Sequence, residues 1–278
     1  MSSILHAGSK TLDISQPVVM GILNATPDSF YNKGKSSDVS SLLQTAEKML
    51  KDGASILDIG GASTKPGQQW VTADEELKRV MPVIEAVVKQ FPGTWLSVDT
   101  YNAAVARAAV EAGVSMVNDV TSGIYDKEMV ATVAALGVPY IIMHMQGTPE
   151  TMQNDPVYDD VFTEVKVFLQ RAIARCEAAG IKEVIVDPGF GFGKTVEHNY
   201  TLLQIAGAFS VLGKPIMAGL SRKSMICKPL HVDPENALNG TTALNMAALQ
   251  AGASILRVHD VKEASEVLQL FHCLETAF

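Results

Sequence analysis

Residues 184–195, with the sequence VIVDPGFGFGKT, combine a carboxylate with a glycine-rich loop. The apolar start is typical of a strand buried on both faces, and Asp187 ends it. Pro188 stops the strand and the alternating glycines free the backbone, so Asp187 is predicted where a strand opens into a loop, the ligand-binding end of parallel α/β folds. A P-loop would need glycine at Pro188, and a dinucleotide fingerprint would need glycine at Lys194, so both are excluded. The alternative is an ordinary turn with a solvated aspartate.

Polar residues also end the other apolar runs of the chain. They are Asn24, Asp58, Asp99, Asn118 with Asp119, His144, Asp187, Arg257 and His259. For each one the alternative is a structural hydrogen bond, and we favour that interpretation for Asp58, Asp119 and His144. Because each buried polar group needs a partner, the convergence of so many favours a binding site.

The last two apolar runs carry the cations of this set. Residues 221–224 read SRKS at the start of a helical pattern, and Arg257 and His259 follow the final run. A helix start with nearby cations is a common phosphate site, and arginine can grip phosphate oxygens with two hydrogen bonds. These residues therefore predict a phosphate or diphosphate site.

The middle runs end on hydrogen-bond acceptors without positive charge, Asp99, Asn118 and Asp187. A carboxylate can accept from a ring N–H and an exocyclic amine together, so this set predicts a neutral heterocycle rich in N–H donors. The six histidines are dispersed and no HExxH is present, which gives little support for a protein-only metal cage. Asn24 and a diphosphate could share one Mg²⁺, which commonly takes few protein ligands.

Eight apolar runs are predicted strands, and helical patterns separate them. The runs are residues 18–24, 55–60, 94–99, 115–120, 139–144, 183–188, 214–219 and 254–259, and the clearest helices are 73–90, 103–112, 158–179 and 236–251. This alternation predicts an α/β fold, a single-domain (β/α)₈ TIM barrel over residues 18–278, with residues 1–17 as an N-terminal cap or tail. A doubly wound sheet is disfavoured because it usually has about six strands and a phosphate fingerprint after the first. The long loops 25–38 and 62–71 are expected to be lids.

Composition limits the class of protein. The chain has 278 residues, 47% of them apolar, and a net charge of −8, which argues against nucleic acid and membrane as main partners. Its N-terminus lacks the apolar core of a signal peptide, and its three dispersed cysteines indicate a reducing compartment. We therefore expect a cytoplasmic location.

Seven motifs, in order and spacing, resemble dihydropteroate synthase. They are GILNATPDSF (21–30), DIGGASTKPG (58–67), SVDT (97–100), NDV (118–120), DPGFGFGKT (187–195), SRKS (221–224) and RVHDV (257–261). The resemblance implies a barrel enzyme, a transferase of folate biosynthesis. It would condense p-aminobenzoate with 6-hydroxymethyl-7,8-dihydropterin diphosphate to dihydropteroate and pyrophosphate. It further implies Mg²⁺, a homodimer and a sulfonamide target.

The resemblance also implies residue roles. The pterin would be held by Asp99, Asn118, Asp187 and Lys223, with Met143 and Phe190 packing its ring. The diphosphate would lie on Asn24, Arg257 and His259, with Mg²⁺ at Asn24. The p-aminobenzoate would meet Phe30, Thr64, Pro66, Phe192 and Ser224. The catalytic residues would be Asp99, Asp187, Lys223, Arg257 and His259.

Two segments depart from the family pattern. Many members have Glu and Arg where Ala62 and Lys65 stand, and Asp-Gly where Asn32-Lys33 stands. Lys65 keeps the charge but loses the planar fork of arginine, so the departures concern the lid contacts. The rivals are a pterin-binding methyltransferase, which would have no diphosphate for these cations to hold, and a non-catalytic pterin-binding paralogue.

Overall fold

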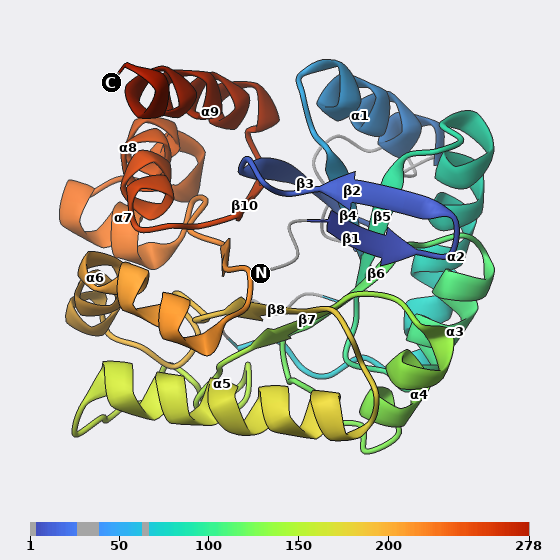
Figure 1. The fold of residues 1–278 in the computed structure, drawn as a ribbon, viewed down its shortest axis with the longest axis horizontal. Helices are drawn as coiled ribbons and strands as arrows, with labels where there is room; N and C mark the ends of the chain where they lie inside the picture. Colours follow the sequence, from blue (N-terminus) through green and yellow to red (C-terminus); the bar gives the residue numbers. More distant parts are fainter. Residues whose placement is uncertain (1–3, 27–38, 63–66, 278) are drawn as a thin grey trace.

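The computed structural model describes residues 4–26, 39–62 and 67–277. It contains the eight predicted parallel strands, so the predicted barrel is confirmed. The strands are β3 (Val18–Asn24), β4 (Ile56–Gly60), β5 (Trp95–Asp99), β6 (Met116–Asp119), β7 (Tyr140–Met143), β8 (Val184–Asp187), β9 (Met217–Ala218) and β10 (Ile255–Val258). Figure 1 shows the helices as an outer ring around them. The strand order is β8-β7-β6-β5-β4-β3-β10-β9, and the Val186 N–H donates to the Pro215 carbonyl at 2.9 Å, which closes β9 onto β8.

Nine α-helices cover the strands in the described part of the chain. They are α1 (Val39–Lys51), α2 (Ala73–Gln90), α3 (Ala103–Glu111), α4 (Met129–Leu136), α5 (Val161–Ala178), α6 (Val196–Gln204), α7 (Ser224–Leu230), α8 (Leu238–Gln250) and α9 (Val261–Thr276). The helix predicted from residue 158 begins at Val161, because the Asp160 side chain accepts from the Thr163 N–H and caps it. None of the described helices is long and apolar enough to cross a membrane.

Alternation along the strands separates two apolar layers. Ile56, Trp95 and Met116 belong to a cluster inside the barrel, whereas their neighbours Leu57 and Leu96 belong to the larger cluster under the helices. Since side chains alternate every second residue, the same parity points the polar ends of the strands inward. The inward set is Asn24, Asp58, Asp99, Asn118, Asp187, Arg257 and His259.

A hairpin, β1 (Ile4–Ala7) and β2 (Lys10–Asp13), precedes the barrel and lies across its N-terminal end (Figure 1). Leu5 and Ile14 join the inner apolar cluster, and the Trp95 indole N–H donates to the Thr11 carbonyl at 3.0 Å. Residues 4–13 are therefore an ordered plug on the barrel floor.

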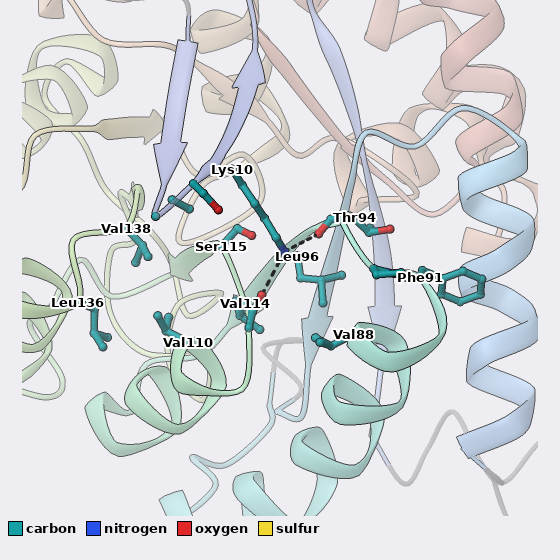
Figure 2. A pocket seen from close by; sticks show the side chains of 16 residues that line it. Lys10, Val88, Phe91, Thr94, Leu96, Val110, Val114, Ser115, Leu136 and Val138 are labelled. Carbon is teal, nitrogen blue, oxygen red and sulfur yellow. Dashed lines mark hydrogen bonds between the residues drawn. The ribbon is translucent and has the colours of Figure 1, made fainter.

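The hairpin lines one side of an open pocket of about 510 Å³, which residues of α2 and α3 also line (Figure 2). Lys10 spans it, and its Nζ donates to the carbonyls of Thr94 at 3.2 Å and Gly113 at 3.4 Å. These carbonyls lie just past the C-terminal ends of the two helices, where a cation is favourable. These hydrogen bonds of Lys10 attach the hairpin to the barrel. The pocket lies at the end of the barrel opposite to the C-terminal ends of the strands.

Candidate active site

Arg257 connects two carboxylates across the mouth of the barrel. Its Nε donates to Asp58 Oδ2 and its Nη2 donates to Asp99 Oδ2, both at 2.6 Å. Asn118 Nδ2 donates to the same oxygen of Asp58 at 3.0 Å. Burial opposes the charge of Arg257, but Asp58 and then Asp99 outweigh it and raise its pKa. Four strands therefore contribute to one network, with the guanidinium at its centre.

The network leaves one acceptor without a donor. In the part of the chain that the structure describes, Asp58 Oδ1 is buried and has no hydrogen-bond partner. Burial raises the pKa of Asp99 to about 7, although Arg257 acts in the opposite direction. A buried acceptor without a donor is costly, so the mouth favours a ligand that supplies N–H groups.

The side chains of Asp187 and Lys223 both lie close to Gly219. A Cβ on Gly219 would stand 3.7 Å from Lys223 Nζ and 3.8 Å from Asp187 Oδ2. Burial raises the pKa of Asp187, opposed by Lys223, and burial lowers the pKa of Lys223 to about 8, opposed by Asp187. Lys223 Nζ also donates to the Phe190 carbonyl at 2.5 Å and lies 4.6 Å from the centre of the Phe192 ring. An acceptor and a donor thus stand side by side, as the edge of a heterocycle requires.

His259 is held by Ser221, at the end of the neighbouring strand. Ser221 Oγ accepts from the His259 backbone N–H at 3.2 Å and lies 3.0 Å from its Nδ1. Desolvation at the mouth, and then Arg257, lower the pKa of His259, although the residue keeps contact with solvent. If Nδ1 of the neutral ring accepts a hydrogen bond from the Ser221 hydroxyl, the ring carries its proton on Nε2, which can then donate to a phosphate oxygen.

The remaining predicted residues are distributed around this network. Asn24 ends β3 and is partly exposed, Ser224 begins α7 and is exposed, and Met143 and Phe190 are 2% and 1% exposed, so each can offer a ligand only an edge. Among the described residues no group of three or more His, Cys, Asp or Glu could hold a metal. Phe30, Thr64 and Pro66 lie outside the described residues, as do Lys65 and Asn32-Lys33.

Two strand-end residues face outward. Asp119 accepts from Gly123, from both the backbone and the hydroxyl of Thr121, and from the Tyr140 hydroxyl at 2.6 Å. The His144 ring packs edge-on against Phe168 of α5. Their partners explain their burial without a ligand, which suits the structural interpretation.

Two further features were not predicted from the sequence. Lys194, 2% exposed, contacts His144 and the loop after β8. Trp70, Tyr101 and Tyr125 form an aromatic cluster from three successive βα loops, with ring centres 4.4–5.0 Å apart and two of the three contacts edge-to-face. Lysine is rarely buried, and aromatic residues far apart in the chain give no local signal.

The barrel gathers carboxylates, an arginine and a lysine at the C-terminal ends of its strands, and its class follows from its similarity to known proteins. Residues 20–259 match the family described as "Pterin binding enzyme". The dihydropteroate synthase of Escherichia coli (strain K12) is 45% identical over 96% of this chain and 94% of its own length, and that of Haemophilus influenzae is 46% identical over 98% and 99%.

Solved structures agree. The dihydropteroate synthase of Yersinia pestis with a sulfonamide drug complex is 44% identical, with a TM-score of 0.93 over 98% of this chain and 99% of its own. That of Xanthomonas albilineans with 4-aminobenzoic acid is 41% identical, with a TM-score of 0.92 over 99% of each chain. The chain belongs to the dihydropteroate synthase family, and it is therefore a transferase of folate biosynthesis.

Proposed function

We propose that the acceptor half of the mouth binds the pterin ring of 6-hydroxymethyl-7,8-dihydropterin diphosphate. Asp187 and Asp99 accept from ring and exocyclic N–H groups, while Asn118 and Lys223 add mixed and donor contacts. The observation that carries this proposal is the convergence of Asp99, Asn118 and Asp187 at one mouth, beside Arg257 and Lys223. A pterin supplies N–H donors to these buried acceptors, so binding offsets part of their desolvation cost.

The diphosphate then lies on Arg257 and His259. As the C–O bond to the pterin methylene breaks, negative charge grows on the leaving pyrophosphate. Arg257 is already oriented by Asp58 and Asp99, so it stabilises that charge without reorganising. The carboxylates of Asp99 and Asp187 meanwhile favour the positive charge that develops on the pterin.

The amine nitrogen of p-aminobenzoate attacks the methylene, a C–N bond replaces the C–O bond, and the nitrogen loses one proton afterwards. No strong base is required, because an aromatic amine attacks without prior deprotonation. We assign Phe192 and Ser224 to this substrate. Phe30, Thr64 and Pro66, which the family resemblance also implies, complete this part of the proposal.

Asn24 is the protein ligand for Mg²⁺ in this proposal. A lone amide oxygen, with the nearby carboxylates engaged by Arg257, suits an ion that keeps several waters and takes phosphate oxygens. When bound, the ion would neutralise charge on the diphosphate.

We also propose that the enzyme is a cytoplasmic homodimer. Exposed apolar side chains lie on two helices that both pack against α8: Leu230 on α7 and Leu270 and Leu274 on α9, between 51% and 62% exposed. Sedimentation at micromolar concentration tests the dimer, and a monomer would contradict it.

The test of the reaction is release of pyrophosphate in the presence of both substrates. We expect release to require p-aminobenzoate and to match the dihydropteroate formed. Binding of pterin without release would instead indicate a non-catalytic paralogue.

A further inference from the structure

The loop after β8 is fixed by side chains rather than by secondary structure. Every carbonyl from Gly189 to Gly193 accepts a side-chain hydrogen bond. The donors are Lys194 for residues 189 and 192, Lys223 for residue 190, Gln153 for residue 191 and Tyr158 for residue 193. Of these bonds only that from Lys194 to the Gly189 carbonyl is fully buried, and a buried carbonyl must find a donor, so Lys194 contributes most to the path of the loop.

Glycine is required at two points of this path. Gly189 and Gly193 have positive φ angles of 72° and 62°. A Cβ on Gly189 would lie 1.9 Å from the His144 carbonyl oxygen, and one on Gly193 would lie 2.4 Å from that of Gln146. The loop therefore packs directly on the backbone after β7, and Lys194 occupies the seam between them.

Lys194 makes three short contacts with its buried Nζ. They are to the Gly189 carbonyl at 2.8 Å, His144 Nδ1 at 2.9 Å and the Phe192 carbonyl at 3.0 Å. Burial lowers the pKa of Lys194 to about 7, opposed by Asp187, and burial followed by Lys194 lowers the pKa of His144 to about 3. As an ammonium, Lys194 donates to all three acceptors. As an amine, it donates to the carbonyls and accepts from the other tautomer of His144, so the contacts persist in either state.

A single residue, Gly189, links Lys194 to the carboxylate of Asp187. The Gly189 N–H donates to Asp187 Oδ1 at 2.7 Å, while the Gly189 carbonyl accepts from Lys194. We infer that Lys194 is a positioning residue for pterin binding: by anchoring Gly189 and Phe192, it orients Asp187 and the loop beside it. This inference rests on the proposed assignment of Asp187 to the pterin.

The alternative is that Lys194 only stabilises the fold. Methionine resembles the lysine stem in length and apolar character. Lys194→Met also removes a buried cation, and Gly189 keeps its second donor, the Phe192 N–H at 3.1 Å. Folding should therefore survive, and the ligand that depends on Asp187 should be affected selectively.

The experiment is calorimetric titration of K194M with a pterin lacking the diphosphate and, separately, with Mg²⁺-pyrophosphate. We expect pterin affinity to fall about tenfold or more, because small misplacements of a binding group have such effects. Pyrophosphate affinity should stay within about twofold. K194R should recover part of the pterin affinity. Y158F, which removes one donor from Gly193 of the same loop, is the matched control and should change neither affinity by more than about twofold.

The inference would be overturned if folded K194M bound pterin within twofold of the parent. It would also be overturned if K194M lost equal affinity for both ligands. If K194M does not fold, K194Q takes its place. Its amide is one atom shorter and cannot span both carbonyls, so the same selective loss is expected, with the same outcomes overturning the inference. D187A run in parallel separates the two claims. If D187A binds pterin as tightly as the parent, the proposed assignment of Asp187 fails. If D187A loses pterin affinity and K194M does not, the assignment of Asp187 stands and the role of Lys194 fails.

Discussion

Asp58→Asn tests whether the buried network orients Arg257, which we propose stabilises the leaving pyrophosphate. Asp58 is 0% exposed, and its Oδ2 accepts from Arg257 Nε at 2.6 Å and from Asn118 Nδ2 at 3.0 Å. Asparagine keeps the shape and one acceptor but removes the charge. A hydrogen bond to a charged group contributes about 1.5–3 kcal/mol, so kcat/KM should fall roughly 10- to 150-fold. Arg257 and Asn118 would lose their shared anchor together.

The assay is steady-state pyrophosphate release, with the melting temperature measured on the same samples. Asp119→Asn is the matched control, since Asp119 is also 0% exposed and strand-terminal but faces the helices. We expect D119N to lower the melting temperature while kcat/KM stays within about threefold of the parent. A folded D58N enzyme within threefold of the parent, or equal kinetic losses in both variants, would refute the reasoning.

Three further predictions concern the pterin pocket, the lids and a buried glutamate. Asp187→Ala should remove two charge-assisted hydrogen bonds, each about 1.5–3 kcal/mol, and lower kcat/KM about a hundredfold or more; a folded variant within threefold in steady-state kinetics would contradict this. If residues 25–38 and 62–71 are lids, a sulfonamide should bind about a hundredfold tighter after Mg²⁺ and pyrophosphate, and equal affinities by calorimetry would contradict it. Burial raises the pKa of Glu76 to about 7, so the folded state holds a proton that the unfolded state releases near pH 4.5. The resulting stability, up to about 3 kcal/mol, is present below pH 4.5 and is lost as the pH rises towards 7. Denaturant unfolding of Glu76→Gln should show a flatter pH dependence over that window, and an unchanged slope would contradict it.

The barrel could be predicted because each of its strands is short, apolar and followed by a helical pattern. The strand-end polar residues were located the same way, and parity within a strand distinguishes Asn118, which faces the mouth, from Asp119, which faces the helices. The hairpin was missed because its strands have only four residues each and alternate polar with apolar side chains.

The internal pairing of the site could not be predicted. Arg257 follows Asp58 by 199 residues. The sequence predicts that Arg257 binds a phosphate and that Asp58 makes a structural hydrogen bond. Only the closed barrel brings them to 2.6 Å. In the sequence, Lys194 is notable only as a mismatch to a dinucleotide-binding motif. Its burial could not be predicted, because the acceptors that permit it include backbone carbonyls, whose positions depend on the fold.

In the proposed enzyme one mouth contains two halves, acceptors for the pterin and cations for the diphosphate. Calorimetric titration of D187A and R257A with a pterin lacking the diphosphate, and with Mg²⁺-pyrophosphate, can separate these halves. We expect opposite losses: D187A should lose pterin affinity and keep pyrophosphate affinity, and R257A should lose far more pyrophosphate affinity than pterin affinity. Equal losses for both ligands in R257A would show that Arg257 is structural, and an unaffected pterin affinity in D187A would remove the acceptor half.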